Sequence, residues 1–335
     1  MKLFRTAAPA LLLGATMMSV ATQSTAAETF KIALGAAQGG GQYVMAERFV
    51  EELEKATDGE LTADLFPNSQ LGSEEDTVMN AAMGMLDFSV LAINNVTPFS
   101  PTVGVLTLPY MIQNLEEAYS LTQGKTAERL VENTARDAGV RIVAWTFSGF
   151  RVLTNSARPV KTLDDLQGLI IRVPKNEIMI DTYKSWGVNP TPMAWSEVFT
   201  ALQQKVVDGQ DLGLIDLESV KFYEVQKYIS NIHYNFLLEP MIMSEQLFQS
   251  QSPEFQQAIL DAGKKATEYS VEFLREREKT ALDELLAKGM EFTEVDEAEW
   301  IEKATAAVWP KFHDSVGGID AINETLEELG RQPIE

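Results

Sequence analysis

The sequence of 335 residues contains no cysteine and only two histidines, His233 and His313. The absence of cysteine excludes disulfide bonds, thiol nucleophiles and every cysteine-ligated zinc or iron–sulfur site. The two isolated histidines leave little room for a histidine-rich metal centre or a Ser–His–Asp triad. Basic residues are also scarce, since 27 Lys and Arg stand against 49 Asp and Glu, a formal net charge of −22. We expect no nucleic-acid partner, because phosphate binding needs a basic face.

Motifs for cofactors and catalysis are missing as well. Gly39 follows an expected strand and precedes an expected helix, but Val44 stands where the third small residue of a dinucleotide-binding loop belongs. The sequence has no Walker A loop, nucleophile elbow, HExxH helix or EF-hand loop. Acid pairs such as Glu74-Glu75 fall at helix starts or on helix faces, which predicts solvated surface. We therefore expect no cofactor, no metal site and no catalytic residue.

The first 27 residues have the parts of a cleavable secretory signal peptide. Lys2 and Arg5 give a basic start, residues 7–20 form an uncharged apolar segment, and small residues ending at Ala27 predict cleavage before Glu28. No cysteine follows that would carry a lipoprotein anchor. The sequence predicts a periplasmic protein, and its strong negative charge favours a monomer.

A second uncharged segment, Phe88 to Leu115, is long enough for a transmembrane helix. Pro98, Pro101 and Pro109 interrupt it, together with several Asn, Ser and Thr residues. A helix in lipid tolerates so many breakers and polar groups poorly. The segment therefore predicts buried strands and loops, without direct membrane insertion.

Strand-like and helix-like segments alternate along the rest of the chain, which predicts an α/β fold with open sheets. The expected strands lie at residues 29–34, 61–65, 86–92, 140–147, 169–173 and 188–193.

A long helix is expected near the C-terminus. Ser252 and Pro253 are typical of a helix start, and Gly289 is typical of its end. A continuous helix between them is about 50 Å long at about 1.5 Å per residue, a length suited to bracing two lobes. The alternative is two helices that are broken near Gly263 or Ser270.

Two arginines lie in otherwise apolar segments. Arg172 follows Ile170-Ile171, and Arg151 lies between Phe150 and Val152. A buried guanidinium needs a partner, because an unpaired charge is costly to desolvate. Two explanations are open for each arginine: an ion pair with an internal acid, or a bidentate clamp for a ligand carboxylate. At the ends of strands in an open sheet, such side chains face the ligand crevice.

The segments around these arginines resemble a known family. The segments "GFRVLTNSARPVKTLDDLQGLIIRVPKNEIM", "GVNPTPMAWSEVFTALQQKVVDGQ" and "VKFYEVQKYIS" are similar to the solute-binding proteins of tripartite ATP-independent periplasmic (TRAP) transporters, the DctP-like family. Upstream, "LFPNSQLGSEED", "GMLDFSV" and "LTLPYMI" resemble its first lobe. The resemblance implies a two-lobed α/β periplasmic binding protein, in which each lobe is an open sheet flanked by helices and a long helix braces both. It also implies a cleft that closes on a ligand, and integral-membrane permease subunits as partners.

The expected lobes are discontinuous in sequence. After the signal peptide, residues 1–27, lobe I comprises residues 28–149 and roughly 237–275. Lobe II comprises residues 150–236 and roughly 276–310. A C-terminal helical segment, 311–335, completes the chain.

The resemblance also implies the ligand-binding residues of the second lobe. Arg172 in "IRVP" occupies the position of the family's carboxylate-binding arginine, and Arg151 that of a second basic contact. Trp195 in "PMAWSEV" covers the ligand, unless it is a core aromatic. The family's "DGQENP" turn reads "DGQDLG" here, so that Leu212 replaces the usual ligand-binding asparagine. Asp211 beside it is either a ligand contact or a turn residue.

In the first lobe, Gln38 and Asn94 follow expected strands, where family members place polar ligand contacts. Together these residues predict a binding protein for a small organic anion, a sugar acid or another carboxylate, that performs no chemistry. A C4-dicarboxylate is one alternative ligand. A small amine or zwitterion is another, held by aromatics and an acid such as Asp211. A periplasmic hydrolase with a carboxylate pair is the remaining alternative function.

Overall fold

The computed structural model describes residues 27–334. The expected signal peptide lies outside the described residues, except for Ala27. The strands are β1 (Glu28–Leu34), β2 (Leu61–Phe66), β3 (Phe88–Val90), β4 (Val140–Asn155), β5 (Arg172–Val173), β6 (Thr191–Pro192), β7 (Gly209–Gly213), β8 (Tyr228–Asn231), β9 (Phe236–Ser244) and β10 (Glu291–Glu294). The helices are α1 (Gly41–Ala56), α2 (Glu74–Ala82), α3 (Leu115–Leu121), α4 (Lys125–Ala138), α5 (Glu177–Ser185), α6 (Val198–Gln203), α7 (Leu214–Ser219), α8 (Glu245–Ser250), α9 (Pro253–Ala287), α10 (Ala298–Phe312) and α11 (Gly318–Glu328). Short 3₁₀ helices include η1 (Ile93–Asn95), η2 (Pro101–Thr107) and η4 (Trp195–Glu197).

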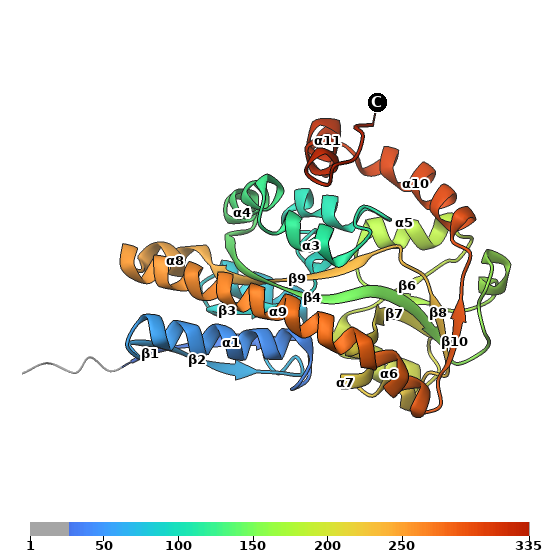
Figure 1. Ribbon diagram of the computed structural model, residues 1–335, viewed down its shortest axis with the longest axis horizontal. Helices are drawn as coiled ribbons and strands as arrows, with labels where there is room; N and C mark the ends of the chain where they lie inside the picture. Colours follow the sequence, from blue (N-terminus) through green and yellow to red (C-terminus); the bar gives the residue numbers. More distant parts are fainter. Residues whose placement is uncertain (1–26, 335) are drawn as a thin grey trace, which may run out of the picture.

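The sheet is built around β4, whose sixteen residues run through the middle of the molecule (Figure 1). The order of its strands is β10-β8-β4-β9-β3-β1-β2, and β7 also pairs with β4. The first part of β4 pairs with β9, and its last part pairs with β7 and β8. One end of the sheet thus contains β1 to β3 under α1, and the other contains β7, β8 and β10. This confirms the expected α/β fold with helices flanking the sheet.

Helix α9 is a single helix of 35 residues that crosses the sheet diagonally (Figure 1). The Oγ of Ser252 accepts a hydrogen bond from the backbone of Phe255 and caps its start. A Cβ atom on Gly263 would lie 1.9 Å from the carbonyl oxygen of Val143 in β4. Gly263 therefore permits close packing on β4, and the alternative of two shorter helices is wrong.

The apolar core is divided between the two ends of the sheet. Phe30, Phe49 and Phe88 pack together beneath α1. At the other end, Trp186 packs edge-on against Trp300, in a separate buried cluster with α5 and α10. Strand β9 and the start of α9 pack at the end of the sheet that contains Phe30, Phe49 and Phe88. Strand β10 pairs with β8 at the other end. The exact boundaries of the two lobes stay a prediction.

Two expected strands are shorter than the sequence predicted. Only Arg172–Val173 and Thr191–Pro192 form ladder pairs, as β5 and β6. Prolines at 174, 190 and 192 limit this small parallel sheet, because proline has no N–H to donate.

The uncharged segment from Phe88 to Leu115 forms β3, η1, η2 and the start of α3, which confirms the prediction of buried strands and loops. Among residues 27–334, no helix is both long and apolar enough to cross a membrane.

Candidate ligand-binding cleft

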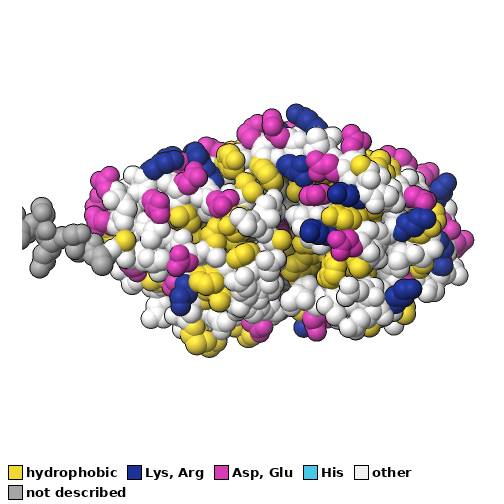
Figure 2. All heavy atoms as spheres, turned by 90° about the horizontal axis from the view of Figure 1, so that it is seen from below, with side chains coloured by type: hydrophobic (Ala, Val, Ile, Leu, Met, Phe, Trp, Pro, Cys, Tyr) yellow, Lys and Arg dark blue, Asp and Glu magenta, His cyan; other side chains and the backbone are white. Residues whose placement is uncertain are grey.

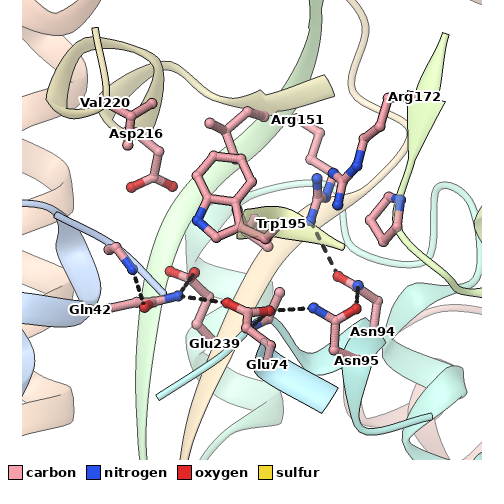
Figure 3. Close-up of a pocket in the computed structure, with 15 residues that line it drawn as sticks. Gln42, Glu74, Asn94, Asn95, Arg151, Arg172, Trp195, Asp216, Val220 and Glu239 are labelled. Atoms are coloured by element: carbon pink, nitrogen blue, oxygen red, sulfur yellow. Dashed lines mark hydrogen bonds between the residues drawn. The ribbon is translucent and has the colours of Figure 1, made fainter. Parts of the chain in front are cut away.

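A pocket lies where the two parts of the sheet meet, and the surface is hollowed between the two halves of the molecule (Figure 2). About 450 Å³ of space at this pocket, open solvent included, is free of protein atoms. Its polar lining residues are Gln42, Glu74, Asn94, Asn95, Arg151, Arg172, Trp195, Asp216 and Glu239, and its apolar ones are Ala36, Ala92, Pro174, Leu212, Val220 and Leu237. They come from both parts of the molecule (Figure 3).

Arg172 brings a buried positive charge to the pocket. It lies on the two-residue strand β5 and is 2% exposed. Its Nε and Nη2 donate to the carbonyl oxygen of Met193, at 3.1 and 2.7 Å. Among residues 27–334, no carboxylate lies within 4.0 Å of its guanidinium. Burial and the nearby charge of Arg151 lower the pKa of Arg172 to about 10. The internal ion pair that was one explanation for Arg172 is therefore absent from the described chain.

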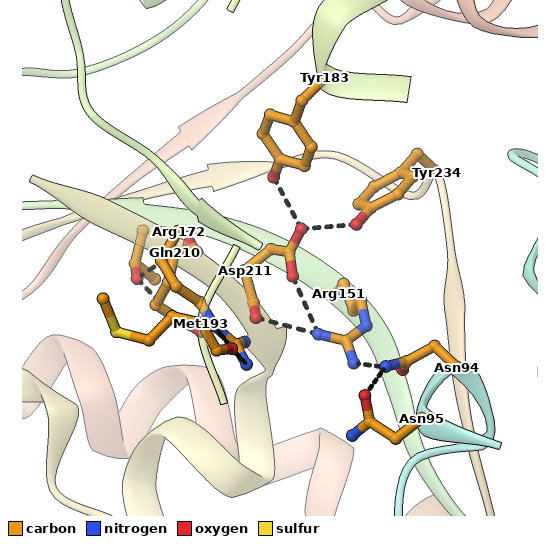
Figure 4. Close-up of polar contacts among 10 residues, drawn as sticks. Asn94, Asn95, Arg151, Arg172, Tyr183, Met193, Gln210, Asp211 and Tyr234 are labelled. Carbon is orange, nitrogen blue, oxygen red and sulfur yellow. Dashed lines mark hydrogen bonds and ion pairs between the residues drawn. The ribbon is translucent and has the colours of Figure 1, made fainter. Parts of the chain in front are cut away.

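Arg151 is equally buried but has an acidic partner (Figure 4). Its Nη1 donates to Oδ1 of Asp211 at 2.9 Å and its Nη2 donates to Oδ1 of Asn94 at 3.2 Å. The other carboxylate oxygen of Asp211 accepts from the hydroxyls of Tyr183, at 2.7 Å, and Tyr234, at 2.5 Å. For Arg151, the structure therefore shows the internal ion pair.

Carboxyl groups line the opposite side of the pocket (Figure 3). Glu239 in β9 accepts a hydrogen bond from Gln42 at 2.7 Å and another from Ser148 at 2.7 Å. Glu74, the first residue of α2, accepts from the side-chain amide of Asn95 and, at 3.3 Å, from the backbone of Ala92. Both of these bonds reach Oε2 of Glu74, and its Oε1 accepts from Gln42 at 3.5 Å, so that protein donors hold both oxygens of each carboxylate.

Asp216 in α7 is the third acid on this side. Its Oδ1 is buried and has no hydrogen-bond partner among the described residues. Burial raises the pKa of Asp216 and of Glu239, and it raises the pKa of Glu74 to about 7, with a further contribution from the charge of Glu239. Three carboxyl groups thus lie on this side of the pocket, and no basic side chain among residues 27–334 forms an ion pair with any of them.

The expectation that Glu74 lies on solvated surface is wrong, because this side chain is only 6% exposed. Ser73 caps α2 so that Glu74 stands at the first helical position. There its carboxylate turns inward toward Gln42 and Asn95 instead of toward solvent.

Trp195 connects the two parts of the molecule across the pocket. It belongs to η4, and its Nε1 donates to the carbonyl oxygen of Gly35, just after β1, at 3.2 Å. Its ring packs on Phe222, with centroids 5.6 Å apart. Together with the bond from Arg151 to Asn94, this contact joins the two parts of the molecule across the pocket.

Comparison with known proteins decides the family. The model of the bacterial extracellular solute-binding protein family 7, DctP, matches residues 33–315. The chain belongs to this family. It is 31% identical over 281 residues to the 2,3-diketo-L-gulonate-binding periplasmic protein YiaO of Escherichia coli, with 84% of this chain and 85% of that protein covered.

Two solved structures of TRAP periplasmic solute-binding proteins are similar to this family 7 protein. One, from Roseobacter denitrificans with bound L-galactonate, is 32% identical with a TM-score of 0.81, over 84% of this chain and 93% of that one. The other, from Rhodobacter sphaeroides in an unliganded open form, is 36% identical with a TM-score of 0.75, over 90% of this chain and 98% of that one. The chain is thus a solute-binding protein of the TRAP type, and the relative with a bound ligand has the higher TM-score despite its lower identity.

The structure of this family 7 protein brings most of the expected site residues together. Arg172, Arg151, Trp195, Leu212 and Asn94 all line the pocket. Their ligand contacts stay a prediction.

Two expected site residues lie elsewhere. Asp211 is fully buried behind the pocket, where its carboxylate holds Arg151. Gln38 is exposed in the turn before α1, outside the pocket lining.

Sequence reasoning missed Gln42, Asn95 and the three acids of the pocket. Two of the acids had a readable signal, because Glu239 interrupts an apolar strand and Asp216 lies between Ile215 and Leu217. The same reasoning that singled out the arginines applies to them. Glu74 had no such signal, since an acid after a capping serine is ordinary at a helix start.

Among residues 27–334, no group of three His, Asp or Glu side chains is arranged to hold one metal ion.

Proposed function

We propose that this protein captures a small organic acid in the cleft, a sugar acid or another carboxylate, and delivers it to the integral-membrane permease subunits of a TRAP transporter. The observation that carries this proposal is the buried guanidinium of Arg172, which faces the pocket without a carboxylate partner in the described chain. A ligand carboxylate matches the planar fork of a guanidinium and supplies the missing negative charge.

The names of the relatives support the same ligand class. L-Galactonate and 2,3-diketo-L-gulonate, which two of them bind, are both sugar acids. The amide groups of Asn94 and Asn95 and the indole of Trp195 line the pocket beside the arginines. The two amides suit the hydroxyls of a sugar acid, because an amide donates and accepts hydrogen bonds without adding charge.

The proposal includes export and closure. We expect the signal peptide to be cleaved after Ala27 and the mature protein to work in the periplasm as a monomer. The expected lobes, residues 28–149 with about 237–275 and residues 150–236 with about 276–310, would close by bending where β4 and β9 pass between them. Mass spectrometry of the exported protein tests the cleavage site, because a mature chain that does not begin at Glu28 contradicts it.

We propose that the protein is not an enzyme. Glu74 and Glu239 share Gln42 as a hydrogen-bond donor, and buried acids with raised pKa values also occur in hydrolases. Incubation of the protein with each bound acid, followed by mass spectrometry of the acid, separates the two functions. Conversion of any bound acid would establish the hydrolase.

The test of binding is a thermal-shift screen of the mature protein against sugar acids, dicarboxylates and amino acids. Ligands that bind only the native state raise the melting temperature. We expect carboxylates to raise the melting temperature of the natural protein but not that of Arg172→Gln. A shift that is equally large in Arg172→Gln would remove Arg172 from the site.

A further inference from the structure

We infer that the ligand carries a protonated nitrogen at the end opposite its carboxylate, and that Glu74, Asp216 and Glu239 form the site for this nitrogen. The inference deepens the proposed function and rests on it, because the carboxylate must first be placed at Arg172. It defines a zwitterion, with one anionic and one cationic end, as the ligand class.

The first argument is the balance of charge inside the cleft. The Arg151 charge is already neutralised by Asp211, at 2.9 Å. This leaves the single positive charge of Arg172 against the three carboxyl groups. None of the three forms an ion pair with a basic side chain among residues 27–334. A ligand that brought only negative charge would neutralise Arg172 and leave the three acids to be neutralised by protons, whereas a cationic group on the ligand would neutralise them directly.

The second argument is an unused acceptor. Asp216 is 6% exposed and lines the pocket, and its buried Oδ1 has no partner within residues 27–334. A buried acceptor without a donor is costly, so that native structures rarely contain one. In Figure 3 its carboxylate points toward the space that Glu239 and Trp195 also face. The geometry thus offers a place for a donor that the ligand supplies.

The third argument is the state in which the other two acids are held. Both oxygens of Glu239 accept hydrogen bonds, from Gln42 and Ser148, and those of Glu74 accept from Asn95 and from Gln42 at 3.5 Å. Side-chain amide donors favour the ionised form of a carboxylate. The surroundings therefore orient the oxygens of both groups as hydrogen-bond acceptors, while burial opposes their ionisation; a cation beside them would favour the ionised forms.

Trp195 adds a surface that suits a cation. Its ring lines the pocket between the arginines and the acids (Figure 3). Organic cations are attracted to the face of an aromatic ring, and tryptophan is the strongest of the three aromatics in this respect. An ammonium group also has three N–H donors, whereas a hydroxyl has one. The acids and the indole therefore fit a protonated nitrogen better than a hydroxyl of a sugar acid.

The test uses acids of four to six carbons that differ only at the far end. The four-carbon set is butyrate, 4-hydroxybutyrate, 4-aminobutyrate and succinate, and D-gluconate with 6-amino-6-deoxy-D-gluconate supplies a matched sugar-acid pair. Affinities are measured by calorimetry on the mature protein. We expect the best amino acid to bind at least about thirtyfold more tightly than its hydroxy counterpart, the low end for an unpaired buried charge. Dicarboxylates should bind most weakly, because their second carboxylate faces the acids.

Variants assign the effect to the acids. Asp216→Asn and Glu239→Gln should each reduce the preference for the amino acid at least about tenfold, which is 1.4 kcal/mol. Binding of the hydroxy acid should change less. Glu218→Gln is the matched control, because Glu218 lies on the same helix but outside the pocket, 3.6 Å from Arg277. Melting curves confirm that each variant is folded.

The outcomes separate this inference from the proposed function. If D-gluconate binds as tightly as 6-amino-6-deoxy-D-gluconate and the hydroxy acids match the amino acids, the zwitterion is excluded while carboxylate capture stands. The same holds if the amino acids bind best but neither acid variant changes that preference. If butylamine binds equally well to the natural protein and to Arg172→Gln, and no acid binds, the carboxylate proposal is wrong and the inference fails with it.

Discussion

The two buried arginines of the cleft have the same exposed fraction, 2%, but opposite surroundings. Arg151 lies on the central strand β4, one diagonal step from Asp211 on the paired strand β7. Arg172 lies on the short strand β5, and its described neighbours offer a carbonyl oxygen instead of a carboxylate. Burial alone therefore does not separate a structural arginine from a ligand-binding one. An arginine with an internal carboxylate partner stabilises the fold, whereas one without such a partner can bind an anionic ligand.

The largest effect should come from breaking the internal pair. Asp211→Asn leaves Arg151 buried without its counter-charge, and we expect the free energy of unfolding to fall by roughly 3–5 kcal/mol. Urea denaturation measures the loss. Arg136→Gln is the control, because its pair with Asp137 is exposed to solvent and its loss should change the free energy of unfolding little. A loss below about 1 kcal/mol in Asp211→Asn would mean that Arg151 is not held by this acid.

The second prediction concerns the arginine without a carboxylate partner in the described chain. Arg172→Gln should lower the affinity for the bound acid at least about a hundredfold, within the roughly 2–5 kcal/mol expected when one partner of a buried charge pair is removed. The unliganded variant should be as stable as the natural protein within about 1 kcal/mol, because no internal ion pair is lost. Calorimetry and urea denaturation measure the two quantities. A large loss of stability with unchanged affinity would reverse the roles of the two arginines.

The third prediction concerns the acidic side of the cleft. The pKa of Glu74 is raised to about 7, so the folded protein binds this proton at a higher pH than the unfolded chain does. The unliganded protein should therefore gain about 2 kcal/mol of stability from this group as the pH falls from 8 to 5.5. Glu239 faces Glu74 across Gln42 and changes stability in the same direction, since its pKa is also raised.

Glu74→Gln should therefore flatten the dependence of unfolding free energy on pH without abolishing it. Glu75→Gln, one position along the same helix and outside the pocket lining, is the control and should keep the full slope. Denaturation at several pH values measures both. An unchanged slope in Glu74→Gln would show that this carboxyl titrates as it does in the unfolded chain.

The smallest effect is expected at Trp195, whose hydrogen bond to Gly35 joins the two parts of the molecule across the pocket. Trp195→Phe keeps an aromatic ring but removes the hydrogen bond from Nε1 to the carbonyl oxygen of Gly35. We expect ligand affinity to fall by about 1 kcal/mol, roughly fivefold. Calorimetry with the best-binding acid measures it. A loss as large as that of Arg172→Gln would mean that Trp195 holds the ligand rather than the closed state.

The sequence by itself determined much of the architecture. The Ser252–Pro253 start and the glycine at 289 place the long helix to within two residues of its observed end, because caps are local features. The aliphatic neighbours of Arg172 and Arg151 predicted that both guanidinium groups are buried. Local patterns are sufficient here, because secondary structure and burial depend mainly on the order of apolar and polar residues nearby.

Which of the two arginines forms an ion pair follows from contacts between segments that are distant in sequence. Asp211 lies 60 positions from Arg151 in sequence, and the register of β4 with β7 puts both side chains on one face. The inward turn of Glu74 likewise depends on Gln42 and Asn95, which other elements supply. The partner of a buried charge is set by strand register and by the packing of distant segments, and no local pattern contains that information.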